Sequence, residues 1–278
     1  MRRLRVSAIS FLNTAPLMWD FEHGERRDFD IAYTVPALCA EAVKAGAVDI
    51  GIIPAITYAT IPNLLVLADV AIAARGPVRS ILLVSEKPLE QVRTIATDSS
   101  SRTSVALLRV LLEKRFGGAR PLSTMAPDLP RMLAKCDAAL LIGDSALRVD
   151  RTRYQVYDLA EEWLKLTGKP FVFVFWAVRM AALAEIAPGT DLARVFRESR
   201  DHGLEPRNVA QLAQEWAPRV GLSEADVLSY LTGNIHYSFG RGARDGLELF
   251  FRCAAEAGII SAIPELRLLG ASVSALVG

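Results

Sequence analysis

The sequence has little cysteine, no excess of charge of either sign and no long uninterrupted apolar run. Its three cysteines, Cys39, Cys136 and Cys253, are widely separated and show no C-x-x-C spacing. An odd number of isolated cysteines argues against a disulfide framework and is typical of buried, reduced thiols. The cysteines therefore predict a cytoplasmic protein.

Charge is balanced: 32 Lys and Arg stand against 31 Asp and Glu, for a formal net charge of +1. A protein that binds a phosphate backbone needs an excess of Lys and Arg to neutralise it. The composition therefore argues against nucleic acid as a partner.

The mean hydropathy is high, at +0.26, so membrane insertion has to be considered. The most apolar stretch, Ile61–Ala74, is interrupted by Pro62 and Asp69, whereas a spanning helix needs about 20 consecutive apolar residues. The arginine-rich start is followed by the apolar segment Val6–Leu12, but no small-residue cleavage site of a secretory signal comes after it. We expect no membrane partner and interpret the segment as a first strand.

Sequence motifs for cofactors are also missing. The chain has no His-Glu-x-x-His, no glycine-rich nucleotide loop and no Gly-x-Ser-x-Gly, and His23, His202 and His236 stand apart from one another. The sequence predicts no metal and no cofactor, and it favours structural or surface roles for the histidines.

Short apolar runs alternate with amphipathic stretches, a pattern typical of βαβ units in an α/β protein. Strands are expected at Val6–Ser10, Ile31–Val35, Val48–Pro54, Leu64–Ala74, Ser80–Ser85, Thr94–Thr97, Pro121–Met125, Ala138–Ile142 and Phe171–Val178. Helices are expected at Thr14–Phe21, Pro36–Ala45, Ser101–Phe116, Leu129–Lys135, Leu192–His202, Asn208–Arg219, Ser223–Leu231 and Leu247–Ala257, with a helix start at Asp144–Arg148.

Two such blocks predict a two-lobed molecule. Residues 1–86 and 177–278 are expected to form lobe 1, residues 87–176 to form lobe 2, and the C-terminal helices to pack on lobe 1. Hinges are expected near 86–88 and 175–178, with the cleft closing on a ligand bound between the lobes, at strand ends and helix starts.

The segment Asp98–Ser104 is the most informative candidate site, because it lies between an expected strand and a long helix. It contains Ser101, Arg102, Thr103 and Ser104. Unpaired N–H groups and a partial positive charge at a helix start bind carboxylate or phosphate, and an arginine adds a bidentate donor. Ordinary capping by one serine is the alternative. The surplus of donors favours an anion site.

Two further turns follow strands. Asp144 is either a helix N-cap or a ligand contact, and Gly143 would let the backbone approach a ligand closely. Asn13 offers a donor and an acceptor without charge, and it fits a turn as well as a catalytic site.

Five segments, taken in order, resemble the chorismate dehydratases of the futalosine route to menaquinone. They are Ser10-Phe11-Leu12-Asn13-Thr14, Gly76-Pro77-Val78-Arg79-Ser80, Ser101-Arg102-Thr103-Ser104-Val105, Leu141-Ile142-Gly143-Asp144 and Pro170-Phe171-Val172-Phe173. The resemblance extends over nearly the whole chain, and its specificity comes from the five segments together.

The resemblance implies the fold of the type-2 periplasmic solute-binding proteins and the conversion of chorismate to 3-[(1-carboxyvinyl)oxy]benzoate with loss of water. It places the functional asparagine of the family at Asn13. From their expected positions in the cleft we add six substrate contacts besides Arg102 and Thr103: Ser10, Ser80, Ser101, Ser104, Gly143 and Asp144.

The sequence leaves two alternatives open. The dihydroxynaphthoate synthase of the same pathway relies on a histidine motif that is not found here, and a non-catalytic anion-binding protein would bind chorismate unchanged. The five segments hold no His, Lys or Glu placed as a base. A hypothesis follows in which the enolpyruvyl carboxylate of the substrate takes the proton and Asn13 supplies orientation.

Overall fold

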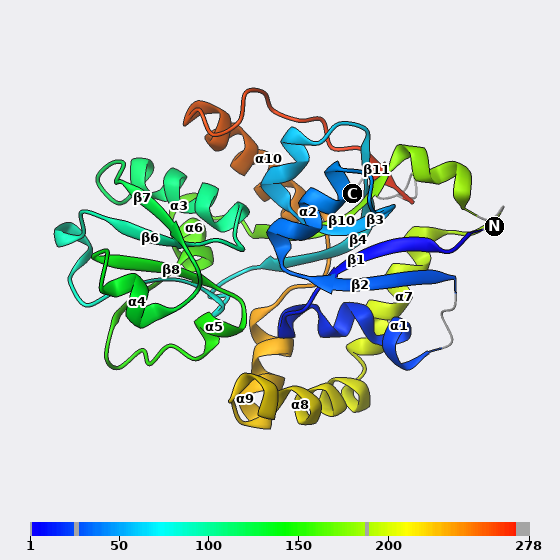
Figure 1. The fold of residues 1–278 in the computed structure, drawn as a ribbon, viewed down its shortest axis with the longest axis horizontal. Helices are drawn as coiled ribbons and strands as arrows, with labels where there is room; N and C mark the ends of the chain where they lie inside the picture. Colours follow the sequence, from blue (N-terminus) through cyan, green and yellow to red (C-terminus); the bar gives the residue numbers. More distant parts are fainter. Residues whose placement is uncertain (1, 25–27, 187–188, 271–278) are drawn as a thin grey trace.

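Two β-sheets, each flanked by helices, organise the chain (Figure 1). The computed structural model describes residues 2–24, 28–186 and 189–270. The first sheet has the strand order β11-β4-β10-β3-β1-β2. Its strands are β1 (Leu4–Ile9), β2 (Phe29–Thr34), β3 (Ile50–Pro54), β4 (Leu64–Ala74), β10 (Phe171–Arg179) and β11 (Leu268–Leu269).

The second sheet has the order β7-β6-β8-β5-β9. Its strands are β5 (Ile81–Ser85), β6 (Ile95–Asp98), β7 (Leu122–Met125), β8 (Ala138–Ile142) and β9 (Gln155–Asp158). In each sheet three neighbouring strands run parallel, β2-β1-β3 in the first and β7-β6-β8 in the second. The carboxyl ends of β1 and β6 therefore lead into the turns that hold Asn13 and Ser101.

Helices cover the sheets and form the C-terminal part. The α-helices are α1 (Trp19–His23), α2 (Pro36–Lys44), α3 (Thr103–Lys114), α4 (Leu129–Leu133), α5 (Asp144–Leu147), α6 (Leu159–Thr167), α7 (Leu192–Gly203), α8 (Pro206–Val220), α9 (Glu224–Ser229) and α10 (Arg241–Glu256). Short 3₁₀ segments are η1 (Leu12–Met18), η2 (Ala55–Thr60), η3 (Leu89–Gln91) and η4 (Met180–Glu185), and η5 (Tyr230–Asn234) is a π-helix.

The crossings between the lobes lie earlier in the chain than the sequence predicts. β4 belongs to the first sheet and β5 to the second, so the chain crosses at residues 75–80 rather than near 86–88. On the return, Phe171 already pairs with Ala74, so the crossing precedes β10 and does not fall at 175–178. The expected boundaries 1–86, 87–176 and 177–278 move accordingly: lobe 2 runs from β5 to α6. A strand buried on both faces has the same sequence pattern in either sheet, which is why the pattern misplaced β5 and the start of β10.

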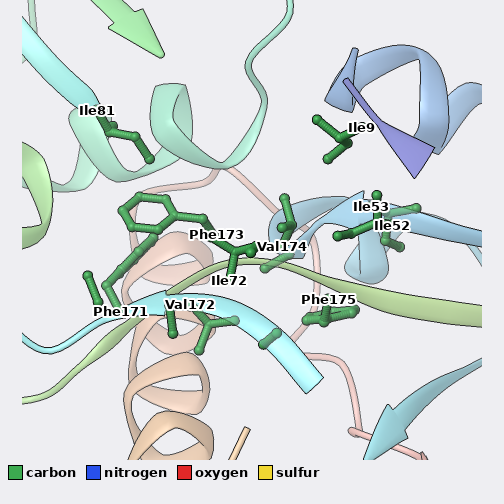
Figure 2. Packing of buried hydrophobic residues seen from close by; sticks show 14 of the residues in the cluster. Ile9, Ile52, Ile53, Ile72, Ile81, Phe171, Val172, Phe173, Val174 and Phe175 are labelled. Carbon is green, nitrogen blue, oxygen red and sulfur yellow. The ribbon is translucent and has the colours of Figure 1, made fainter. Parts of the chain in front are cut away.

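The C-terminal helices pack on the first lobe, as expected: α7 contacts β4 and η1, and α10 contacts β10. The aromatic residues of β10 belong to the core, where Phe171 lies between Trp163 and Phe250 at ring centroid distances of 5.4 and 4.8 Å. Figure 2 shows the β10 residues Phe171 to Phe175 within this packing. All three cysteines are free and buried, as the sequence predicts.

Local patterns missed two kinds of element. The pair β9 and α6 was not expected at all, although Asp158 caps α6 by accepting from the N–H groups of Ala160 and Glu161. The expected helix Thr14–Phe21 is instead the 3₁₀ segment η1 followed by the short α1, with Pro16 inside η1. Proline lacks an N–H donor, which disfavours a regular α-helix at that point.

Candidate active site

A pocket lies where the two lobes meet, and we call it the inner pocket. It is lined by residues from both lobes: Ile9, Phe11, Asn13, Pro36, Pro54, Ile72, Ile81, Ser101, Arg102, Thr103, Ser104, Ile142, Gly143, Phe173 and Val174. Figure 2 shows Ile9 and Ile81 on either side of Phe173 and Val174 in this lining. The structure therefore brings together Asn13, the Ser101–Ser104 turn and Gly143, six of the nine predicted site residues.

The lobe 2 wall of the inner pocket is the start of α3. No side chain caps this helix. Ser101 and Ser104 are buried, and both line the inner pocket. Asp98, at the end of β6, accepts from the N–H and the hydroxyl of Ser100 at 2.9 and 2.6 Å, so its carboxylate shapes the turn. An uncapped, hydroxyl-rich helix start facing a pocket is suited to a carboxylate.

Thr103 has a structural contact in addition to its place in the pocket. Its hydroxyl oxygen accepts from the N–H of Ile56 in lobe 1 at 3.2 Å. A second bond between the lobes runs from the N–H of Ala37 to the carbonyl oxygen of Ser100, at 3.1 Å. The same turn thus faces the pocket and holds the lobes together.

Gly143 packs closely against Phe11, in the turn that follows β1. Its φ is +61°, and a Cβ atom there would lie 2.7 Å from the Phe11 ring. A positive φ and this close approach both require glycine. Gly143 thereby allows the Phe11 ring to close one side of the pocket.

The sequence predicts Asp144 as a helix N-cap or a substrate contact. The N-cap prediction is wrong. Gly143 is the N-cap residue of α5, without a side-chain cap bond. The Asp144 carboxylate instead accepts from the N–H of Leu12, in lobe 1, at 3.0 Å. Burial raises its pKa to about 6, against the lowering influence of that bond and of Arg148. Asp144 does not line the inner pocket. Its bond to Leu12 connects the two lobes next to that pocket.

The lobe 1 wall is mostly apolar, and Asn13 is its polar side chain. Asn13 sits in η1, directly after β1. Thr14 fixes this turn, because its hydroxyl donates to the carbonyl oxygen of Ile9 at 2.6 Å. The amide of a side chain held in this way can donate to and accept from one bound ligand.

Like Asp144, the predicted site residues Ser10 and Ser80 lie outside the inner pocket. Ser10 is exposed, and its hydroxyl donates to the carbonyl oxygen of Thr34 at 3.3 Å. Ser80 is fully buried, and its carbonyl oxygen accepts from the N–H of Gly143 at 2.8 Å. Ser10 is therefore a turn residue at the end of β1. Ser80 holds the backbone of Gly143, which lines the pocket.

A second, outer hollow adjoins the inner pocket. It shares Phe11, Arg102 and Ile142 with the inner pocket, and the acidic residues Glu41, Asp98 and Asp144 line it together with Arg148. Arg102 is exposed and lines both spaces. The predicted site residue Asp144 therefore lies in the outer hollow and not in the inner pocket.

Sequence reasoning missed a buried phenol. Tyr230 is buried, and the side chains of Ser80 and Asn13 are close enough to its hydroxyl to oppose part of the effect of burial on its pKa. Burial raises its pKa further above the usual value for a phenol. No local motif marks this tyrosine, because its partners come from distant parts of the chain. His236 lies outside the pocket: it bridges to Ala73, and burial lowers its pKa.

Metal and membrane sites can be considered for the part of the chain that the structure describes. There, no group of three or more His, Cys, Asp and Glu side chains is arranged to hold a metal ion. Among the same residues, no helix combines the length and the apolar character that a bilayer crossing needs.

Sequence comparison relates the chain to one family. A family model described as menaquinone biosynthesis matches residues 4–256. A chorismate dehydratase of Thermus thermophilus is 30% identical over an alignment of 259 residues that covers 86% of this chain and 91% of that protein.

Solved structures agree on the fold. A protein of Archaeoglobus fulgidus has a TM-score of 0.73 at 15% identity, covering 93% of this chain and 98% of its own. The periplasmic aliphatic sulphonate binding protein of Escherichia coli has a TM-score of 0.65 at 17% identity, covering 98% and 95%. The periplasmic-binding-protein fold expected from the sequence is therefore confirmed.

Proposed function

This chain belongs to the menaquinone biosynthesis family, and from that premise we propose that it is a chorismate dehydratase. The reaction is the loss of water from chorismate to give 3-[(1-carboxyvinyl)oxy]benzoate, which makes the enzyme a hydro-lyase. A cytoplasmic location accords with its three free, buried cysteines.

The observation that carries the proposal is the pairing of an uncapped helix start with Asn13 across one pocket. Chorismate is a dianion. The α3 start, with Arg102, supplies N–H, hydroxyl and guanidinium donors for one carboxylate. The apolar residues of the opposite wall, such as Ile72 and Phe173, suit the six-membered ring.

The chemical step follows from what lines the pocket. Of the described residues in its lining, none carries a carboxylate, an imidazole or an amine. We propose that the enolpyruvyl carboxylate removes the C3 proton, that the C4 hydroxyl leaves, and that the transferred proton completes the departing water. The ring becomes aromatic. Asn13 holds the carboxylate or the leaving hydroxyl, contributing orientation in a site that excludes water.

Incubation of the purified protein with chorismate tests the proposal, with ultraviolet spectra and mass spectrometry as the readout. We expect an aromatic product lighter than chorismate by one water. Recovery of unchanged chorismate from a protein that binds it would favour an anion-binding protein, the function of the sulphonate-binding structural relatives. A protein that neither binds nor converts chorismate would contradict both.

A further inference from the structure

We propose that the Phe11 side chain is a gate between the outer hollow and the inner pocket, which chorismate passes when the ring rotates and while the lobes stay together. The proposal rests on the proposed function, because chorismate is the ligand whose size and entry are considered. It concerns access to the site and adds no step to the reaction.

The two spaces differ greatly in size. The inner pocket has a volume of about 40 Å³, whereas the outer hollow has about 640 Å³. A cavity of the smaller size holds roughly three water molecules, and sites for small molecules measure about 300–1,000 Å³. Chorismate, with its six-membered ring and two carboxylates, therefore does not fit in the inner pocket alone. It reaches Asn13 and the α3 start when the two spaces join.

Three residues line both spaces and form the partition between them: Phe11, Arg102 and Ile142. Ile142 is buried at the end of β8, where its backbone pairs with that of Ile81. Arg102 is exposed, and as a donor it attracts an anion into the site instead of excluding it. Phe11 is therefore the bulky apolar side chain that separates the two spaces.

The backbone of Phe11 is fixed, so its ring is the part that can move. The carbonyl oxygen of Phe11 accepts from the N–H and from the hydroxyl of Thr14, at 3.0 and 2.7 Å. The N–H of the next residue, Leu12, donates to the Asp144 carboxylate at 3.0 Å. The ring lies against Gly143, and Phe11 is only partly buried. A change of side-chain rotamer toward the outer hollow opens the partition while the turn stays in place.

Separation of the lobes is the alternative route of entry, and it would break more contacts. Three hydrogen bonds join the lobes next to the site: Ile56 N–H to the Thr103 hydroxyl oxygen, Ala37 N–H to the Ser100 carbonyl oxygen, and Leu12 N–H to the Asp144 carboxylate. Opening the lobes at this place breaks all three, whereas rotation of one ring breaks none. The geometry therefore favours passage beside Phe11.

The association rate constant, measured by surface plasmon resonance, tests the gate. Phe11→Leu and Phe11→Ala shorten the side chain, and Leu38→Ala is the control, because Leu38 is 56% exposed and lines the outer hollow but not the inner pocket. One set of proteins also carries Asn13→Ala, which slows conversion, and takes chorismate as the ligand. A second set keeps Asn13 and takes the reaction product as the ligand.

We expect Phe11→Ala to associate about tenfold faster than its parent protein in both sets. The open position of a gate is a minor state populated at about 10% or less, and the apparent binding constant is reduced by that fraction. Phe11→Leu should give an intermediate rate, and Leu38→Ala should associate at the rate of the parent. Phe11→Leu keeps an apolar side chain at this position, so the gate remains testable if Phe11→Ala lowers stability.

Two results would overturn the gate. One is association at the parent rate in both Phe11 variants, which points to entry by separation of the lobes. The other is an equally faster association in Leu38→Ala, which assigns the effect to lost apolar surface in the outer hollow. A native protein that neither binds nor converts chorismate would refute the proposed function whatever the Phe11 variants do, so the two failures are distinguishable.

Discussion

The two walls of the inner pocket differ in how they are built. The lobe 2 wall gathers its donors in one turn, Ser101–Ser104, at the start of a single helix. The lobe 1 wall is apolar around one amide, Asn13, which lies in η1 directly after β1. Under the proposed function we expect a division of labour in which lobe 2 binds the charge of the substrate and lobe 1 orients the reacting atoms.

The largest expected effect is that of Asn13→Ala. Turnover should fall roughly 10²–10³-fold, the cost of removing one preorganised donor from an active site, while chorismate still binds. Steady-state kinetics and calorimetric binding measure the two separately. Equal losses of binding and turnover would mean that Asn13 binds the substrate as Arg102 does, and would contradict the separate roles of the two walls.

Arg102→Ala should act mainly on binding. Hydrogen bonds to charged groups contribute roughly 1.5–3 kcal/mol, so KM should rise about 10- to 150-fold. Arg109→Ala is the control, because Arg109 is exposed on the same helix but outside the pocket lining. A native KM for Arg102→Ala would remove Arg102 from the site.

Gly143→Ala tests the close contact between the walls. The added Cβ would meet the Phe11 ring at 2.7 Å on a residue with φ +61°. We expect a loss of about 3 kcal/mol in the free energy of unfolding, from overpacking and backbone strain combined. Gly168→Ala isolates the strain, since Gly168 has φ +68° and nothing within 4 Å of the new Cβ. If both variants lose the same free energy of unfolding in chemical denaturation, the Phe11 ring moves away from the added Cβ atom at no cost.

Asp144→Asn should change the pH dependence of stability. The pKa of Asp144 is raised to about 6, so the folded protein binds its proton more tightly than the unfolded chain does. The native protein then loses stability as pH rises from about 4 to about 6, and the variant does not. We expect the variant to gain on the order of 2 kcal/mol relative to the native protein over this interval, and to keep the gain above it.

Melting temperatures from pH 4 to 8 measure this difference. Asp137→Asn should show the opposite trend, because Lys87 and nearby N–H groups lower the pKa of Asp137. A constant difference between Asp144→Asn and the native protein would mean that the carboxylate is not held in a buried bond between the lobes.

The difference between the two walls also explains which site residues could be predicted from the sequence. The Ser101–Ser104 turn was predicted to bind an anion because its signal is local: hydroxyls and an arginine at a helix start. Asn13 was placed by family resemblance. Both line the inner pocket, and their roles stay predictions. Tyr230 was not predicted, since it is near Asn13 and Ser80 only in the folded chain and these residues belong to three separate segments. The strand Ile81–Ser85 was recognised as buried, but burial alone does not say which sheet contains it. Closure of the lobes on a ligand stays a prediction.

Single-turnover rates at saturating chorismate, measured side by side for Asn13→Ala and Arg102→Ala, test the division of labour most directly, because they separate chemistry from binding. We predict a near-native rate for Arg102→Ala once it is saturated and a rate reduced roughly 10²-fold or more for Asn13→Ala. The reverse pattern, or the same reduction in both variants, would contradict it.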